Sequence, residues 1–302
     1  MPARRCRNTE ADVPTTVDAH HHVWSLARGD YGWLTADFAA IHRDFSLKDL
    51  APLREQTGIA GTVLVQAAPT VAETQYLLDV AARSDGVVHG VVGWADLAAP
   101  NAIPTLTRLA RNPLLKGVRP MLQDMGDDAW ILRAEVGRAL AALPRLGLRF
   151  DALVRPGQLP ALLTMIERHP DLAVVIDHAA KPAIAGGMWE PWARLMRAAA
   201  ASPRVRCKLS GLVTEAGPGW TIDVLRPYVD FLAETFGPQR LMWGSDWPVV
   251  NLAGTYQSWY AATIALTAAW SPEDRAALLG GTARRFYGLD EIRTRDDDLR
   301  WK

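Results

Sequence analysis

The sequence predicts an α/β fold, a closed (β/α)8 TIM barrel with extra helices at its C-terminus. Eight short apolar runs alternate with seven segments of helical spacing, and no change of composition divides the chain. The run Leu172–Ile176 is apolar at every position, as burial on both faces of a parallel sheet requires. At 302 residues, the chain is long enough for one barrel-sized domain.

The expected strands are short runs rich in β-branched and apolar residues. Such runs suit a sheet that is covered by helices, because each strand is then buried on both faces. They cover Thr16–Trp24, Thr62–Ala67, Val87–Trp94, Leu115–Leu122, Leu148–Val154, Leu172–His178, Val205–Leu209 and Arg240–Gly244.

The expected helices between the strands have apolar residues at a spacing of three to four. After the eighth strand, Thr255–Trp270 and Arg275–Phe286 predict two more helices, the second preceded by Ser271 as N-cap and Pro272 at the first helical position. The seven helices between strands are Ser46–Thr57, Ala72–Arg83, Ala102–Arg111, Ala129–Leu146, Gln158–Arg168, Trp189–Ala201 and Thr221–Phe236.

Three further segments complete the expected organisation. Residues 17–290 form a single barrel domain, with a polar N-terminal tail over 1–16 and a polar C-terminal tail over 291–302. The stretch Ser25–Arg43 is rich in Gly, Trp and Tyr and is too long for a tight turn between a strand and a helix. We expect it to form a lid or wall over a site.

Composition excludes several classes of function. The 33 basic residues balance 33 acidic ones, so no bulk charge favours nucleic acid or an anionic membrane. No apolar run is long enough to span a bilayer, and no apolar stretch follows the arginines near the N-terminus as a secretory signal requires. Cys6 and Cys207 are not expected to form a disulfide. These observations predict a cytoplasmic protein, monomeric or a small homo-oligomer.

Two motifs at opposite ends of the chain carry the strongest chemical signal. Each closes an apolar run: Val17-Asp-Ala-His-His-His22 near the start and Gly244-Ser-Asp-Trp-Pro248 near the end. Because side chains alternate along a strand, His20 and His22 share one face. Two imidazoles and one distant aspartate, Asp246, suffice to hold a metal ion or an activated water.

Other polar and aromatic side chains follow the remaining strands. In a (β/α)8 barrel the carboxyl ends of all strands meet at one mouth, where the active sites of such enzymes lie. Burying polar groups there without partners is costly, so their gathering implies a ligand, a metal or a network. The residues are Gln66, Trp94, Arg119, Asp151, Arg155, His178, Lys208 and Ser210.

Four segments in order resemble the amidohydrolase superfamily, and within it the branch of sugar-lactone and muconolactone hydrolases. They are the His20–His22 motif, Asp177–Pro182, Cys207–Gly211 and the Asp246 motif, and the likeness runs from about Val17 to Leu289. The resemblance implies a (β/α)8 barrel, the hydrolytic opening of a lactone, and one divalent metal or none. The partner it implies is a small-molecule lactone, most simply a sugar aldonolactone.

The resemblance also implies roles for individual residues. His20 and His22 match the first-strand pair, His178 the sixth-strand histidine and Asp246 the eighth-strand aspartate. We expect these four to hold one metal ion, with Zn²⁺ the first candidate. A binuclear centre is not expected, because the fifth strand offers Asp151 and no histidine.

In the expected mechanism Asp246 is the general base that activates water, and later delivers the proton to the ring oxygen. Arg119, His178 and the metal belong to the catalytic group, with Arg119 polarising the lactone carbonyl. In a metal-free variant Asp246 relies on its position and on the cations Arg119 and Lys208. Substrate hydroxyls are expected to contact Gln66, Trp94, Asp151, Arg155, Lys208 and Ser210.

Other interpretations stay open from the sequence alone. The same barrel suits a lactone isomerase or a metal-dependent decarboxylase, and a non-catalytic sugar-binding barrel is a third possibility. For single residues, His20 and His22 can be ordinary hydrogen-bonded strand-end histidines, and Asp246 can cap the segment that follows it. Arg119 and Lys208 can form salt bridges within the mouth.

Overall fold

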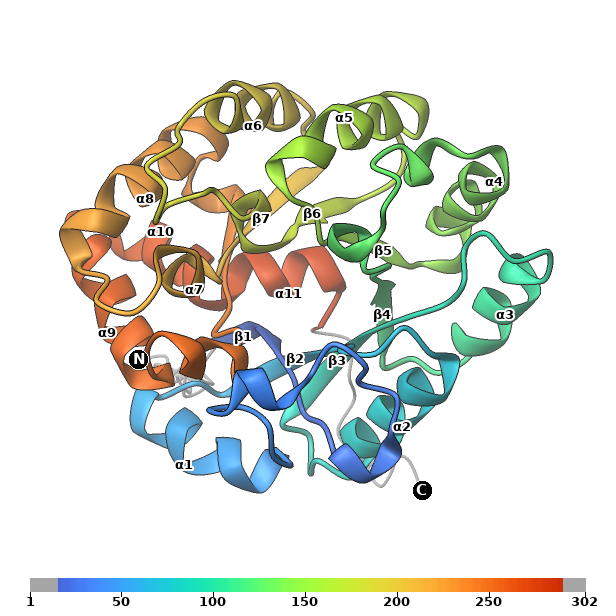
Figure 1. Ribbon diagram of the computed structural model, residues 1–302, viewed down its shortest axis with the longest axis horizontal. Helices are drawn as coiled ribbons and strands as arrows, with labels where there is room; N and C mark the ends of the chain where they lie inside the picture. Colours follow the sequence, from blue (N-terminus) through green and yellow to red (C-terminus); the bar gives the residue numbers. More distant parts are fainter. Residues whose placement is uncertain (1–15, 290–302) are drawn as a thin grey trace, which may run out of the picture.

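The computed structural model describes residues 16–289 and confirms the predicted barrel. Eight parallel strands follow one another in chain order in a single sheet. Figure 1 shows the strands as a ring with the helices outside it. The polar tails expected at 1–16 and 291–302 lie outside the described residues, apart from Thr16.

The strands are mostly shorter than the predicted runs. Residues that follow a strand leave the ladder and turn into the mouth of the barrel, which is why the apolar signal continues past several strand ends. The strands are β1 (Val17–His21), β2 (Gly61–Val65), β3 (Val88–Gly93), β4 (Leu115–Val118), β5 (Arg149–Ala152), β6 (Val174–Ile176), β7 (Val205–Leu209) and β8 (Leu241–Trp243).

The ring closes between β8 and β1 through the two predicted motifs. The backbone N–H of Asp246 donates to the carbonyl oxygen of His20 at 2.8 Å, and the N–H of His22 donates to the carbonyl of Trp247 at 2.7 Å. These bonds lie just beyond the end of β8. The hydrogen bonds that close the barrel therefore also bring the two motifs together.

The predicted helices are present, with one addition. The short helix α7 (Leu212–Ala216) was not expected, and α4 is shorter than its predicted segment because 3₁₀ turns, Trp130–Leu132 and Pro144–Leu146, flank it. The other helices before the C-terminal segment are α1 (Leu47–Thr57), α2 (Val71–Ala82), α3 (Ala102–Leu109), α4 (Ala134–Ala142), α5 (Leu159–Arg168), α6 (Trp192–Ala200), α8 (Ile222–Phe236) and α9 (Tyr256–Leu266). Within residues 16–289, none of the helices has the length and apolar character that crossing a membrane requires.

The C-terminal segment differs from the prediction of one continuous helix over Arg275–Phe286. It forms α10 (Pro272–Ala276), a π-helical turn (Ala277–Gly281) and α11 (Thr282–Tyr287). Gly280 has extended backbone inside this turn, and that conformation breaks the helix.

The last helix, α11, covers the amino-terminal end of the barrel, and Figure 1 shows it across the middle of the ring. Arg149, at the start of β5, donates to the carbonyl of Phe286 at 2.7 Å, and Lys116, early in β4, donates to that of Gly288 at 3.2 Å. Apolar side chains of α11 pack among side chains from the strands to form a second core. Its members are Val17, Ala19, Val63, Val65, Val92, Val175, Met242, Ala283, Phe286, Tyr287 and Leu289.

Candidate active site

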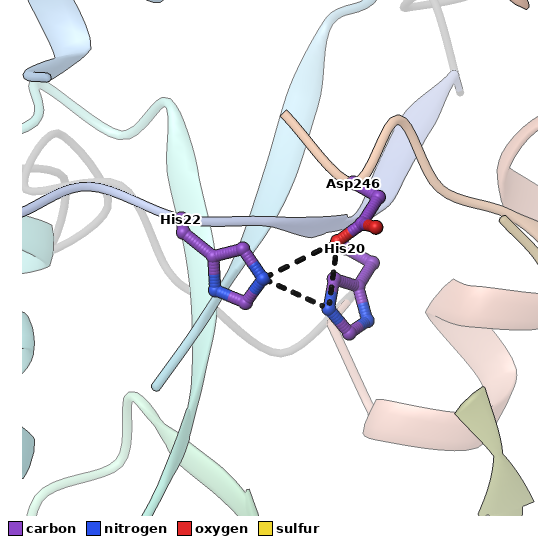
Figure 2. Close-up of side chains that lie close together, drawn as sticks. All are labelled: His20, His22 and Asp246. Carbon is purple, nitrogen blue, oxygen red and sulfur yellow. Dashed lines mark hydrogen bonds and ion pairs between the residues drawn. The ribbon is translucent and has the colours of Figure 1, made fainter. Parts of the chain in front are cut away.

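The two histidines of β1 and the aspartate after β8 converge at the mouth of the barrel, as predicted. His20 Nε2 lies 3.2 Å from His22 Nε2 and 3.7 Å from Asp246 Oδ1. His22 Nε2 lies 3.4 Å from the same carboxylate oxygen. Figure 2 shows the three side chains pointing toward one another. All three are buried, so their polar atoms have little access to bulk water.

Local backbone geometry aims Asp246 into the site. Its φ is 55°, in the left-handed region that aspartate tolerates better than most residues. A Cβ at Gly244 would lie 2.6 Å from the Cβ of His20, so only glycine permits this close approach. The Asp18 carboxylate accepts the N–H of Ser245 at 2.9 Å and that of His20 at 3.1 Å. Asp18 therefore links the two motifs through hydrogen bonds to both.

His178 joins the same cluster from a strained turn after β6. Residues 178–181 all have φ between 50° and 58°, a run that costs L-residues conformational energy and is typical of functional sites. His178 Nδ1 lies 2.8 Å from Ser210 Oγ, and its Nε2 lies 3.8 Å from Asp246 Oδ1. A Cβ at Gly211 would lie 2.8 Å from the His178 ring. Ser210 and Gly211 therefore fix the orientation of His178.

A charged network lies beneath the histidines. Lys208 Nζ donates to Asp151 Oδ2 at 2.6 Å and forms an ion pair with Asp177 Oδ1 at 3.0 Å. It lies 3.1 Å from His20 Nδ1, and all four side chains are completely buried. The Lys208 ammonium group therefore contacts two carboxylates and one imidazole.

Arg119 reaches the site from the end of β4. Its guanidinium donates to Gln66 Oε1 at 3.0 and 2.7 Å and also to the Gln66 carbonyl. Nη1 lies 3.5 Å from Asp177 Oδ2 and 3.4 Å from His20 Nε2. Arg119 is thus held by Gln66 on one side and faces His20 and Asp177 on the other.

The protonation states in the cluster follow from burial and neighbouring charges. Burial, helped by the Lys208 ammonium, holds the pKa of His20 well below its usual range, and burial lowers that of His178 to about 4. Burial alone would raise the pKa of Asp246, but His178, His22 and His20 together lower it below its ordinary value. At neutral pH the site therefore holds an ionised Asp246 beside neutral rings of His20 and His178.

A cavity of about 300 Å³ opens above these residues. This volume lies at the lower end of the range for small-molecule sites. His22, Arg119, His178 and Asp246 contribute to its lining. The other lining residues are of both kinds: Trp33, Phe38, Ala67, Met121, Leu153, Val249 and Leu252 are apolar, and Gln123, Asp124, Arg155, Lys181 and Thr214 are polar.

The residues expected to bind substrate separate into two groups. Arg155 is exposed and lines the cavity. Gln66, Asp151, Lys208 and Ser210 are buried and support Arg119, His20 and His178 through the contacts above.

Trp94 belongs to neither group. It is half-buried and is not among the residues that line the cavity. Its backbone N–H donates to the Thr74 hydroxyl oxygen at 2.7 Å, and that hydroxyl donates to the Trp94 carbonyl at 2.9 Å.

Sequence reasoning gave no role to three residues that the structure places at the site. Asp177 contacts Lys208, and its other oxygen faces Arg119. In the sequence, Asp177 could have been recognised by its position directly after a buried strand and before His178. Trp33 and Phe38 line the cavity from the segment predicted to be a wall, and Trp33 Nε1 donates to the carbonyl of Ala67 at 2.7 Å.

The cavity wall after β2 depends on a buried carboxylate, Glu73, which accepts the N–H groups of Ala67 and Ala68 at 2.9 Å each. Burial raises the pKa of Glu73 to about 7. A carboxyl whose folded pKa is raised stabilises the fold below its unfolded pKa, and this contribution is lost as pH rises through the folded value.

We therefore expect Glu73→Gln to change the pH dependence of stability. Between about pH 4.5 and 8, the wild type should lose roughly 3 kcal/mol of unfolding free energy relative to the variant. Urea unfolding at several pH values measures this difference. The control Glu167→Gln, at an exposed position on α5, should give a difference that does not vary with pH. A flat difference for Glu73→Gln as well would contradict the raised pKa.

The spacing of the cluster fits one divalent metal ion. Ligand atoms bonded to tetrahedral zinc at about 2.0–2.1 Å lie roughly 3.4 Å apart, close to the separations among His20 Nε2, His22 Nε2 and Asp246 Oδ1. His22 Nδ1 lies 2.8 Å from the carbonyl of Val65, so it carries the proton and Nε2 is free to coordinate.

His20 needs a change of tautomer before it can coordinate. Because Lys208 can only donate, His20 Nδ1 must accept, and the proton of the neutral ring is then on Nε2. Coordination requires this proton to move to Nδ1, which lies 3.6 Å from Asp177 Oδ1. This separation exceeds a hydrogen-bond distance, so the His20 ring must shift toward Asp177 before the moved proton has an acceptor.

Comparison with known proteins gives a consistent family. Residues 17–289 match the amidohydrolase family. An L-fucono-1,5-lactonase of Burkholderia ambifaria is 47% identical over 278 residues, which cover 91% of this chain and 96% of the relative. A second L-fucono-1,5-lactonase, of Burkholderia multivorans, is 37% identical, with coverage of 91% and 96%.

A solved structure agrees with these relatives. The crystal structure of an amidohydrolase from Burkholderia multivorans with bound zinc superposes with a TM-score of 0.86 at 37% identity, and the match covers 91% of this chain and 99% of that one. The family match, over residues 17–289, includes all eight strands of the barrel and the last helix, α11. The chain belongs to the amidohydrolase family.

Proposed function

We propose that this enzyme hydrolyses a sugar lactone, with L-fucono-1,5-lactone as the first candidate substrate. The observation that carries the proposal is the ionised Asp246 at the base of a small cavity, with imidazoles of His20, His22 and His178 within 3.4–3.8 Å of its Oδ1 atom. Two relatives over most of the chain are L-fucono-1,5-lactonases, which supports this class of substrate.

Lactone opening requires a base for water, donors for the developing oxyanion and a proton for the departing alkoxide. Asp246 takes the water proton and returns it to the ring oxygen, so it ends the cycle ionised. Arg119 Nη1 can donate to the carbonyl oxygen, and in the metal-free enzyme the Nε2–H of His20, 3.4 Å from Nη1, can be a second donor. His178 lies beside Asp246 and orients its carboxylate.

We further propose that the site binds one divalent ion, with Zn²⁺ the first candidate. His20, His22 and Asp246 would hold it, with His178 adjacent. A bound ion of this kind polarises a carbonyl oxygen and lowers the pKa of a bound water to about 7. Three buried carboxylates, Asp151, Asp177 and Asp246, face two buried cations, Lys208 and Arg119, and this excess of negative charge supports cation binding.

The remaining functional assignments stay predictions. Arg155 is the predicted substrate contact that faces the cavity, beside Gln123 and Thr214, and we propose that these three contact ring hydroxyls. No observation favours the isomerase, decarboxylase or sugar-binding alternatives. A cytoplasmic location and a monomeric or small homo-oligomeric state are likewise proposals from the sequence.

A pH-indicator assay tests the proposed function. Purified enzyme and L-fucono-1,5-lactone should release acid well above the rate with heat-denatured enzyme, which corrects for spontaneous hydrolysis. A lactone isomerase would consume the substrate without releasing acid, and a sugar-binding protein would do neither.

The same assay, repeated with a chelator, tests the metal. Elemental analysis of the purified enzyme should find about one zinc per chain, and His22→Ala should lower that occupancy severalfold because it removes one of three ligands. Equal zinc content in the variant and the wild type would refute this ligand set. Full activity without bound metal would leave the hydrolysis to Asp246, Arg119 and His20 alone.

A further inference from the structure

A tyrosine from the last helix of the barrel floor contacts the charged network under the active site. Tyr287 ends α11, and its side chain is almost completely buried, with 1% of the residue exposed. Its hydroxyl donates to Asp151 Oδ2 at 2.6 Å, across 136 residues of sequence. The ring itself packs edge to face on Phe286, with 4.8 Å between centroids.

The hydroxyl is not explained by packing. A buried hydroxyl costs free energy unless it is hydrogen-bonded, and a phenylalanine would fill the same space at no such cost. Asp151 accepts hydrogen bonds on Oδ2, from Tyr287 and from Lys208, while Oδ1 has no partner among the described residues. Tyr287 therefore supplies one of the two hydrogen bonds that hold this buried carboxylate.

From Asp151 the contacts lead directly to the site. Lys208 donates to Asp151, lies within hydrogen-bond distance of His20 Nδ1 and forms an ion pair with Asp177. Its contact with His20 Nδ1 fixes the histidine tautomer and hence leaves the proton on Nε2, which points to the catalytic cluster. A shift of Asp151 displaces Lys208 and weakens that contact.

We propose that Tyr287 is a positioning residue for the active site, acting from the barrel floor through Asp151 and Lys208 to hold the His20 side chain in place and, in the metal-free enzyme, to keep its proton on Nε2. It touches neither the cavity nor the reacting atoms. The effect on activity rests on the proposed lactone hydrolysis, whereas the effect on the tautomer does not.

Kinetics with matched variants test the first effect. Tyr287→Phe keeps the ring and removes the hydroxyl, and we expect kcat to fall about tenfold with KM within about twofold of wild type. The control Tyr228→Phe makes the same change at a buried tyrosine of α8, in the outer helical layer, and should leave both constants unchanged. A wild-type kcat in Tyr287→Phe would overturn the proposal.

A double-mutant cycle distinguishes positioning from general loosening of the fold. If Tyr287 acts through Asp151, adding Tyr287→Phe to Asp151→Asn should lower kcat by much less than it does in the wild type. The same tenfold loss in both backgrounds would show that Tyr287 acts by another route. Thermal melting of each variant confirms that the proteins compared are folded.

Nitrogen NMR of the imidazoles tests the second effect without any substrate. In chelator-treated wild type, His20, assigned by comparison with His20→Asn, should show the single tautomer with its proton on Nε2. Tyr287→Phe should give a mixture, and Tyr228→Phe should not. A mixture in the wild type refutes the proposal even if no variant folds, and failure of the lactone assay alone refutes only the proposed function.

Discussion

Replacing Asp246 with asparagine is expected to lower kcat by about a thousandfold while the barrel stays folded. General-base catalysis contributes about 10²–10⁴-fold, and asparagine cannot take up the proton of water. Asparagine also tolerates the left-handed backbone at φ 55°. The bond from the residue 246 N–H to the His20 carbonyl, which helps to close the ring, uses only backbone atoms.

The measurement for Asp246→Asn is the lactone assay together with a thermal melt. Asp171→Asn is the matched control, because Asp171 is exposed and precedes β6, at the end of the barrel opposite the site. It should retain wild-type kcat. Turnover by Asp246→Asn within tenfold of wild type would remove Asp246 from the role of base.

The pKa of Asp246 bears on how activity should depend on pH. Its histidine neighbours outweigh burial and keep the carboxyl ionised well into the acidic range. Loss of activity on mild acidification, at pH 5–6, is therefore expected from other buried carboxyls, such as Asp18 and Asp151, whose pKa values burial raises to about 6.

The sequence was sufficient to predict the barrel and the core of the site. Parallel strands place their carboxyl ends together, so motifs more than two hundred residues apart, at His20 and Asp246, could be predicted to meet. The alternation of strand side chains likewise placed His20 and His22 on one face. Both predictions depend only on regular geometry, which local sequence encodes.

The parts that could not be predicted depend on irregular backbone and on long-range packing. The π-helical turn at Ala277–Gly281 redirects the chain so that Tyr287 enters the barrel floor. No local pattern distinguishes that tyrosine from an ordinary core residue. Similarly, Trp94 follows its strand as Arg119 does, but its backbone bonds to Thr74 and its side chain does not line the cavity.

Lys208 shows why strand-end position alone does not separate substrate contacts from supports. The sequence placed it at the mouth, where it was expected to contact substrate. In the structure its ammonium group is fully buried against Asp151, Asp177 and His20, and it is not among the residues that line the cavity. The interpretation as a salt bridge within the mouth, which the sequence left open, describes these contacts.

Replacing Lys208 with methionine is expected to cause the largest loss of stability, about 3–5 kcal/mol at pH 7. Methionine has similar length, but it leaves the buried carboxylates of Asp151 and Asp177 without their shared cation, and an uncompensated buried charge is strongly destabilising. Urea unfolding measures the effect. Lys48→Met, at an exposed position on α1, should change the unfolding free energy by less than about 0.5 kcal/mol.

Two further measurements connect the loss in Lys208→Met to charge rather than to packing. Adding Asp151→Asn removes one orphaned carboxylate, so the double variant should recover part of the lost stability. The Lys208 ammonium lowers the pKa of the buried Asp151 carboxyl, so that pKa rises further when the lysine is removed. A carboxyl with a raised folded pKa favours the fold at low pH. The loss of unfolding free energy in Lys208→Met, relative to the wild type, should therefore be smaller at pH 5 than at pH 7. A packing defect would cause the same loss at both pH values. A loss below about 1 kcal/mol at pH 7 would mean that the carboxylates find other partners or water when the lysine is gone.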